Sequence, residues 1–148
     1  FPKQIAFNVI PQGGTFLENG YETEEEKLMF ETRKILNDQN IKITATVVRV
    51  PVMNGHSESV YFETIKNATT DEILNCLKEG KGIRLPESPA EYFTPLDISG
   101  FDDVYVSRVR KDLDYLNSFH LWVVADNLRK GAALNAVQIA ELILQKKS

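Results

Sequence analysis

The sequence has 148 residues, a length that suits one domain, and 43% of them are hydrophobic and 26% charged. This composition supports a buried core and excludes disordered, collagen-like and coiled-coil proteins. The 21 acidic residues outnumber the 17 basic ones, for a net charge of −4, and no basic run is present to follow a nucleic-acid backbone, so we expect no nucleic-acid partner.

The single cysteine, Cys76, excludes an internal disulfide and a cysteine zinc cluster. No apolar segment approaches the roughly 20 residues that a membrane-spanning helix needs. We therefore expect a cytoplasmic protein with no membrane partner and no metal. The chain begins at Phe1 without an initiator methionine or a signal pattern, which we interpret as a piece of a longer protein.

The first third of the chain contains two predicted strands and one predicted helix. Residues 4–10 (QIAFNVI) predict a short apolar strand, followed by a proline and a glycine pair. Residues 23 to about 38 are typical of a helix, because Thr23 and Glu26 have the spacing of a capping box and apolar residues recur at helical intervals. Residues 41–50 (IKITATVVRV) are rich in β-branched residues and predict a strand.

The rest of the chain begins with an Asn54-Gly55 turn signal. A helix is predicted over residues 69–79, where Thr69 and Glu72 form a second capping box and Gly80 provides the C-cap. The other predicted elements are strands at 59–65, 104–109 and 119–125, a proline-containing loop at 85–100, and an apolar terminal helix from 130 to about 146.

These elements indicate an α+β fold, because strands and helices are interspersed without a strict βαβ order. Hairpin-like turns join several strands, so we expect a mixed, largely antiparallel sheet covered by helices. No glycine-rich phosphate loop follows a strand at the start of the chain, and we expect no nucleotide-binding domain within residues 1–148.

Three charged residues in the first third are candidates for ligand binding. Glu24 and Lys27 lie three positions apart in the first turn of a predicted helix, and therefore on one face. They form either a solvated ion pair or part of an anion site, where the helix N-terminus and the ammonium group would bind a phosphate. Arg49 lies in the apolar segment VVRVPV. Its guanidinium either meets an acidic side chain or binds a carboxylate ligand.

His56 is the candidate for proton transfer. It follows the Asn54-Gly55 turn, and the ordinary imidazole pKa, about 6.5, suits a general base, although a turn histidine can also be merely exposed. We interpret His120, within a predicted strand, as structural. Cys76 lies in an amphipathic helix, and we interpret it as buried and unreactive.

Several segments together resemble the aspartate-β-semialdehyde dehydrogenase family, and the similarity covers nearly the whole chain. In the order of the sequence they are residues 20–35 (GYETEEEKLMFETRKI), 44–59 (TATVVRVPVMNGHSES), 107–112 (SRVRKD) and 122–133 (WVVADNLRKGAA). The resemblance implies oxidation of an aldehyde to an acyl phosphate with NADP, through a cysteine thioester. The reverse direction serves lysine, threonine and methionine biosynthesis.

The resemblance also implies a role for each candidate residue. His56 would be the catalytic acid and base. Arg49 would bind the substrate carboxylate through a two-pronged contact, to which a guanidinium is better suited than an ammonium. Glu24 would contact the substrate amino group, and Lys27 would bind phosphate or the acyl phosphate. Asn127 would contact the nicotinamide carboxamide of NADP.

The family's nucleophilic cysteine belongs to a segment that precedes this domain, and Cys76 does not match it. We therefore expect residues 1–148 to be a single C-terminal catalytic and dimerisation domain, inactive alone but part of an active full-length enzyme. Two alternatives stay open: a non-catalytic dimerisation module of a relative without the cysteine, and a related acyl-phosphate reductase.

The last predicted helix, residues 130 to about 146, is apolar around most of its circumference, which is typical of a helix buried on more than one side. The resemblance implies that this helix packs on a nucleotide-binding domain and that the sheet face forms a homodimer. We expect the small-molecule substrate, phosphate and a second copy of the chain as partners.

Overall fold

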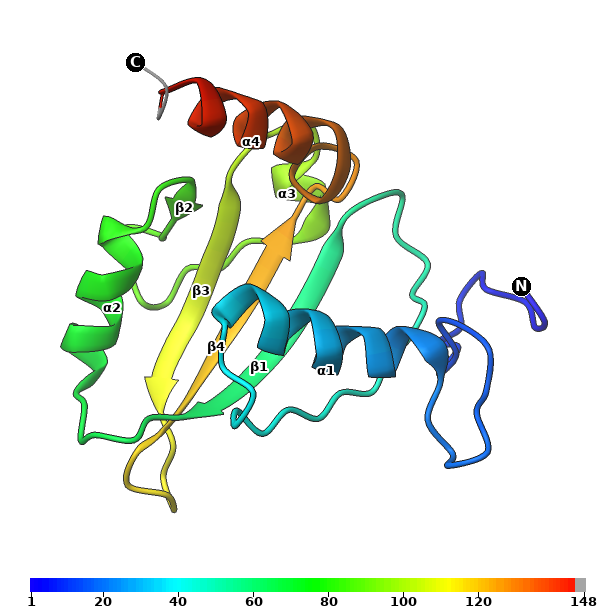
Figure 1. The fold of residues 1–148 in the computed structure, drawn as a ribbon, viewed down its shortest axis with the longest axis horizontal. Helices are drawn as coiled ribbons and strands as arrows, with labels where there is room; N and C mark the ends of the chain where they lie inside the picture. The colour runs from blue at the N-terminus through cyan, green and yellow to red at the C-terminus, as the bar shows by residue number, and fades with distance from the viewer. Residues whose placement is uncertain (146–148) are drawn as a thin grey trace. The chain divides into compact units, whose positions relative to one another are not determined.

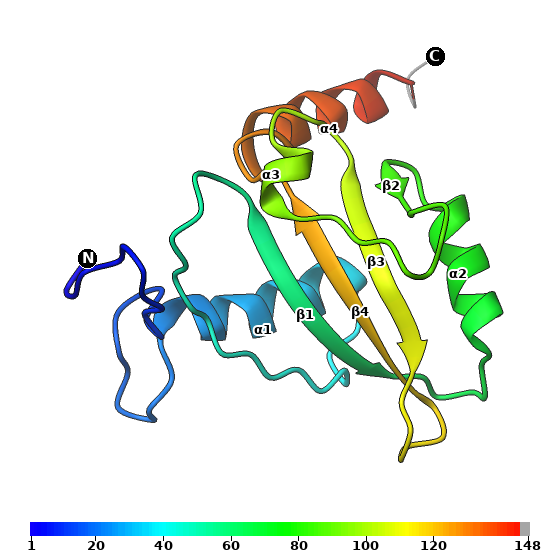
Figure 2. The ribbon, with the colours of Figure 1, turned by 180° about the vertical axis from the view of Figure 1, so that it is seen from behind.

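The computed structural model describes residues 1–145, and Figure 1 and Figure 2 show its ribbon from opposite sides. The chain divides into two compact units, Phe1–Pro51 and Val52–Ser148, of which the second is described as far as residue 145. Over the described part of the chain, every helix is too short or too polar to cross a membrane.

The first unit contains helix α1 (Thr23–Leu36), where a helix is predicted. Its N-cap is Glu22, whose backbone N–H donates to Oε2 of Glu25 at 3.1 Å. The capping box predicted at Thr23 and Glu26 is therefore wrong by one residue. The reason is that the Thr23 hydroxyl accepts a hydrogen bond from the backbone N–H of residue 15, at 3.2 Å, and so belongs to the preceding loop.

The strand predictions at residues 4–10 and 41–50 are wrong. The two segments meet in one isolated antiparallel bridge, in which the N–H of Ile10 donates to the carbonyl of Arg49 at 3.0 Å and the reverse bond is 2.8 Å. Phe7 has a φ of 58°, a left-handed conformation that interrupts an extended segment.

Residues 41–50 stay out of a regular strand for a different reason. β-branched side chains favour a strand where a neighbouring strand packs beside them, and within the first unit only the bridge at Arg49 supplies such a neighbour. The N–H of Val47, which a sheet would bond, donates to Oε1 of Glu25 at 3.0 Å. The segment is thus held by a side chain of α1.

The second unit is built on a four-stranded sheet of order β1-β4-β3-β2 (Figure 1). β1 and β4 are antiparallel, as are β4 and β3, whereas β3 and β2 are parallel. This confirms the α+β class with a mixed, largely antiparallel sheet. The strands are β1 (His56–Glu63), β2 (Ile83–Arg84), β3 (Val104–Lys111) and β4 (Ser118–Ala125).

Two strand boundaries differ from the prediction. β1 begins at His56 rather than at residue 59, because the residues after the turn already pair with the end of β4. β3 continues to Lys111 through an irregularity between Ser107 and Arg110, where Arg108 takes a φ of 58°. A bulge of this kind lets a strand continue after an unpaired residue.

The core of the second unit lies where β3, β4 and a short helix meet. Phe119 and Val124 of β4 are fully buried, and Val106 of β3, opposite Val123 in the register, is buried as well. The short helix α3 (Pro95–Ile98) lies in the segment predicted as a loop at 85–100 and buries Ile98. This packing fixes the segment next to β4.

The other helices of the second unit are α2 (Thr70–Glu79) and α4 (Leu134–Gln145). The α2 prediction is confirmed with its caps: Thr69 Oγ1 accepts from the N–H of Glu72 at 3.2 Å, and Gly80 ends the helix. Figure 1 shows α2 along the β2 edge of the sheet. The predicted terminal helix begins as a π-helical segment, η1 (Arg129–Ala133), before α4. Its predicted end, Lys146, lies outside the described residues.

Candidate functional site

Glu24 and Lys27 form an ion pair in the first turn of α1. Lys27 Nζ lies 3.5 Å from Glu24 Oε2, and both side chains are about half exposed. Three acidic residues already occupy this turn of α1, and their carboxylates offset the positive end of the helix. Of the two interpretations from the sequence, the solvated ion pair is the arrangement that the structure contains.

Arg49 is exposed, and one of its nitrogens, Nη2, donates to the carbonyl oxygen of Gly13 at 2.8 Å. None of the carboxylates in residues 1–145 pairs with it. A guanidinium has five N–H donors, so several remain for a ligand. The acidic partner that the sequence left open for Arg49 is therefore not found in residues 1–145, and its binding of a carboxylate ligand stays a prediction.

Glu22 was missed by sequence reasoning, although it organises the loop that Arg49 contacts. Its side chain is buried, and Oε2 accepts from the N–H groups of Gly13 and Gly14 at 2.5 and 2.7 Å. A Cβ on Gly14 would lie 2.2 Å from the hydroxyl oxygen of Thr23, so the loop approaches α1 too closely for a side chain. The Gly-Gly pair is the sequence signal for this approach.

His56 and Asn127 lie at the same end of the β1–β4 pair, which Figure 1 shows as the start of β1 beside the arrowhead of β4. His56 is opposite Ala125 in the register, and its side chain is exposed. The N–H of Gly55, the residue before His56, donates to Oδ1 of Asn127 at 2.8 Å. The structure therefore brings together two of the residues predicted for the site.

Asp126 is a second residue that sequence reasoning missed. It is buried, and Oδ2 accepts from Asn54 Nδ2 at 3.0 Å and from the N–H of Gly100 at 2.8 Å, while Oδ1 accepts from the N–H of Leu128 at 2.9 Å. The hydrogen bond from Gly100 is the main cause that holds the pKa of Asp126 below its ordinary value, against the effect of burial. The turn signal at Asn54 did not indicate this distant partner.

His120 and Cys76 lie outside this arrangement. His120 Nε2 is 2.6 Å from Oδ2 of Asp112, so the side chain has a structural partner. That contact, with two backbone N–H bonds, lowers the pKa of Asp112 to about 2. Cys76 is exposed on α2, and the expectation that it is buried is wrong, because this helix buries none of its residues.

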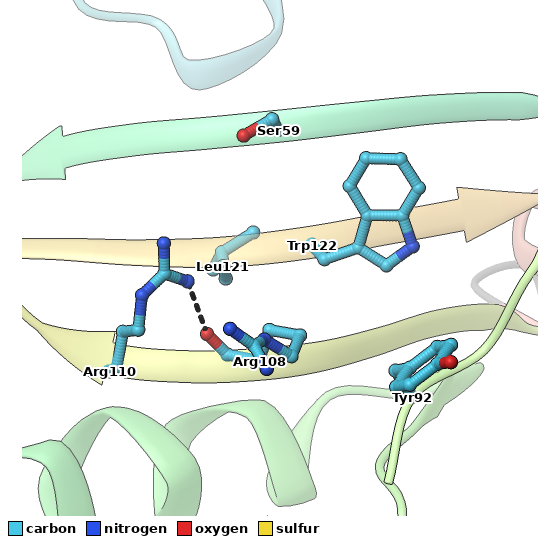
Figure 3. A pocket seen from close by; sticks show the side chains of 6 residues that line it. All are labelled: Ser59, Tyr92, Arg108, Arg110, Leu121 and Trp122. Carbon is cyan, nitrogen blue, oxygen red and sulfur yellow. Dashed lines mark hydrogen bonds between the residues drawn. The ribbon is translucent and has the colours of Figure 1, made fainter. Parts of the chain in front are cut away.

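A hollow of about 330 Å³ lies on the sheet of the second unit (Figure 3). Arg110 Nη1 donates to the carbonyl of Arg108 at 3.0 Å, and neither guanidinium pairs with an acidic side chain in the part of the chain that the structure describes. Sequence reasoning noted these arginines only as part of the SRVRKD segment. The hollow is lined by Ser59, Tyr92, Arg108, Arg110, Leu121 and Trp122. Within residues 1–145, no group of three or more His, Cys, Asp or Glu residues is arranged to hold a metal.

Comparison with known proteins gives a consistent result. The family model for the semialdehyde dehydrogenase dimerisation domain matches residues 1–130. A curated relative, the aspartate-semialdehyde dehydrogenase of Shewanella violacea, is 53% identical over 146 residues, which are 98% of this chain and 43% of the relative. The chain thus spans less than half the length of that relative.

Solved structures agree with this match. The aspartate semialdehyde dehydrogenase II of Vibrio cholerae, in complex with ASA, is 48% identical and superposes with a TM-score of 0.93 over 98% of this chain and 43% of that one. The enzyme of Candida albicans with NADP is 27% identical, with a TM-score of 0.73 over 97% of this chain and 46% of that one.

Proposed function

Because the chain belongs to the semialdehyde dehydrogenase family, we propose that it forms the catalytic and dimerisation part of an NADP-dependent aspartate-semialdehyde dehydrogenase. This oxidoreductase would interconvert aspartyl 4-phosphate and aspartate 4-semialdehyde through a cysteine thioester. The observation that supports the proposal most is the hydrogen bond from the N–H of Gly55 to Asn127. It joins the residue before His56, the candidate acid and base, to the candidate cofactor-binding residue.

His56 would act as the acid and base. In the oxidative direction its ring takes the proton of the thiol as the sulfur attacks the aldehyde carbon, a hydride leaves that carbon, and a phosphate oxygen then displaces the sulfur from the thioester. The side chain is exposed and bonds to no other residue between 1 and 145, so its ring nitrogens are available for this proton. The cysteine would come from a segment that precedes this domain in the family.

Arg49, Glu24 and Lys27 would hold the substrate. The free donors of Arg49 suit a carboxylate, which a guanidinium binds with two parallel hydrogen bonds. The exposed pair of Glu24 and Lys27 is worth at most about 1 kcal/mol. A substrate with an ammonium group and a phosphate can therefore replace it, giving Glu24 the ammonium group and Lys27 the phosphate.

Asn127 would contact the cofactor. Its Oδ1 is already engaged by the N–H of Gly55, while Nδ2 has no protein partner in the described residues. The free Nδ2 group fits a carboxamide oxygen, such as that of nicotinamide. When bound, NADP supplies the hydride acceptor or donor. The Candida albicans relative was solved with NADP, which supports the same cofactor here.

The proposal extends to the assembly and the setting of the enzyme. The matched family model is a dimerisation domain, and we propose a homodimer formed by the sheet face. The proposed reaction belongs to the biosynthesis of lysine, threonine and methionine, in the cytoplasm.

The test is the full-length enzyme with His56→Ala, assayed for NADP-dependent oxidation of aspartate semialdehyde in phosphate. Loss of the acid and base should lower kcat by about 10²–10⁴-fold. His120→Gln is the matched control, because it alters the other histidine, whose partner is Asp112, and should leave kcat within a few-fold.

Wild-type turnover in His56→Ala would remove the role of His56. A full-length protein without any NADP-dependent turnover would favour the non-catalytic dimerisation module. Activity restricted to a different acyl phosphate would favour the related reductase.

A further inference from the structure

We propose that Asp126 is a positioning residue for His56, acting through the Asn54-Gly55 turn. The inference rests on the proposed function, since it takes His56 as the catalytic acid and base. It concerns a buried carboxylate whose hydrogen bonds come from Asn54, Gly100 and Leu128.

Three consecutive residues at the end of β4 each hold one residue of the turn. Asp126 Oδ2 accepts from the side chain of Asn54 at 3.0 Å, Asn127 Oδ1 accepts from the N–H of Gly55 at 2.8 Å, and Ala125 is opposite His56 in the β1–β4 register. The segment from residue 54 to residue 56 is thus fixed residue by residue.

The Asp126 carboxylate is held in the fold by two further hydrogen bonds. It is 3% exposed, and it accepts from the backbone N–H of Gly100, which follows α3, and of Leu128, which leads into η1. A buried carboxylate that accepts several hydrogen bonds stays ionised, and bonds to an ionised acceptor are stronger than bonds between neutral groups. The acceptor for Asn54 is therefore itself held rigidly.

The turn leaves little freedom for another conformation. Gly55 has a φ of 97°, and a Cβ placed on it would lie 3.3 Å from the carbonyl oxygen of Ala125. The backbone is packed against β4 at the residue before His56. Losing the Asn54–Asp126 bond would remove the side-chain hydrogen bond that ties Asn54 to the segment after β4 and let the turn move.

A small movement of His56 has a large effect on proton transfer. A general base works at hydrogen-bond distance, about 2.6–3.2 Å, from the proton that it takes. A misplacement of about 1 Å can lower the rate by about 100-fold. Loss of the hydrogen bonds that hold residues 54–56 should therefore lower kcat. Substrate binding, which uses Arg49, Glu24 and Lys27, should stay nearly unchanged.

The experiment compares two variants of the full-length enzyme. Asn54→Ala removes only the bond to the turn, whereas Asp126→Asn also disturbs the bonds from Gly100 and Leu128. We expect kcat to fall about 10- to 100-fold in each single variant, with KM for the semialdehyde changed less than about threefold. Asn75→Ala is the matched control, because Asn75 is exposed on α2 and bonds to no side chain in residues 1–145.

Hydrogen exchange at the amides of Gly55 and His56 gives a readout that does not need activity. Exchange at Gly55 should accelerate at least about tenfold in both single variants and stay unchanged in Asn75→Ala. Wild-type kcat and exchange in Asn54→Ala would overturn the inference. So would a loss of kcat in Asn54→Ala together with a lowered Tm and equally accelerated exchange throughout the second unit, since that result indicates general destabilisation.

A failure of the proposed function can be distinguished from a failure of the positioning role of Asp126. An inactive wild-type enzyme contradicts the proposed function, while the exchange rates still decide whether Asp126 holds the turn. An active wild-type enzyme with an unaffected Asn54→Ala variant contradicts only the positioning role.

Discussion

Gly55 has a left-handed backbone conformation directly before His56 in the candidate site. Its φ of 97° suits glycine, and the nearest atom to an added Cβ is the Ala125 carbonyl oxygen at 3.3 Å. Gly55→Ala should lower the free energy of unfolding by about 1–2 kcal/mol through the left-handed conformation alone, and should lower kcat at least about tenfold by moving His56. Thermal unfolding and steady-state kinetics measure the two effects separately.

Gly20→Ala is the control for this variant. Gly20 has a φ of 85°, and an added Cβ there would meet no atom within 4 Å. It should lower Tm by a similar amount without changing kcat. Equal kinetic effects in the two variants would show that stability, and not the turn, controls the rate.

A substitution at Arg49 tests whether this residue binds the substrate carboxylate. Arg49→Lys keeps the positive charge but removes the planar pair of donors. Hydrogen bonds to charged groups contribute about 1.5–3 kcal/mol, so KM for the semialdehyde should rise about 10- to 100-fold in the full-length enzyme. Arg33→Lys is matched to it, since Arg33 also donates to a backbone carbonyl, that of Ile41 at 3.2 Å. An unchanged KM in Arg49→Lys would contradict the assigned role.

At the scale of elements, the local capping signals predicted α2, whereas contacts that depend on distant partners were not predicted. The ends of α2 are set by Thr69, Glu72 and Gly80, all within the helix or next to it, so the sequence predicts them. Residues 41–50 have the composition of a strand, but a strand also needs a neighbour, and composition does not contain that information. The same holds for Asp126 and Asn54, whose contact spans 72 positions. His56 and Arg49 could be named from residue type and position, whereas Asn127 could be named only because it lies in a segment that resembles a known family.

The connection between β3 and β4 carries an acid-sensitive contact. Asp112 accepts hydrogen bonds from His120 and from the N–H groups of Asp114 and Tyr115, and its pKa is lowered to about 2 from the ordinary 3.8. A carboxyl whose folded-state pKa is depressed stabilises the fold above its unfolded pKa. This contribution is therefore complete above about pH 4 and is lost as the pH falls from about 4 to 2.

Asp112→Asn should lower stability at pH 7 and flatten its dependence on pH between about 4 and 2, as measured by urea unfolding across that range. Asp114→Asn is the control, because the side chain of Asp114 is exposed and takes part in no hydrogen bond within the described chain. If wild type and Asp112→Asn lose stability in parallel below pH 4, the contact does not carry the acid sensitivity.

At the scale of the whole molecule, α4 presents much apolar surface. Val137, Ile139, Leu142 and Ile143 are each more than half exposed, and the main packing of α4 within its unit is with η1. Exposed apolar patches of this kind mark surfaces that bind another protein or domain. We propose that α4 packs on the nucleotide-binding part of the full-length enzyme.

The isolated chain should consequently associate, through the sheet face, through α4, or through both, and light scattering at tens of micromolar should give a mass of a dimer or more. Ile139 and Ile143 are one helical turn apart on α4 and half exposed. Ile139→Lys/Ile143→Lys should therefore remove any association that depends on α4 and leave a dimer formed by the sheet face.

Asn135→Lys/Gln145→Lys adds the same two charges at exposed polar positions of α4 and should not change the mass. A strict monomer of the unaltered chain would contradict the association, and a larger species that survives Ile139→Lys/Ile143→Lys would assign it to a surface other than α4.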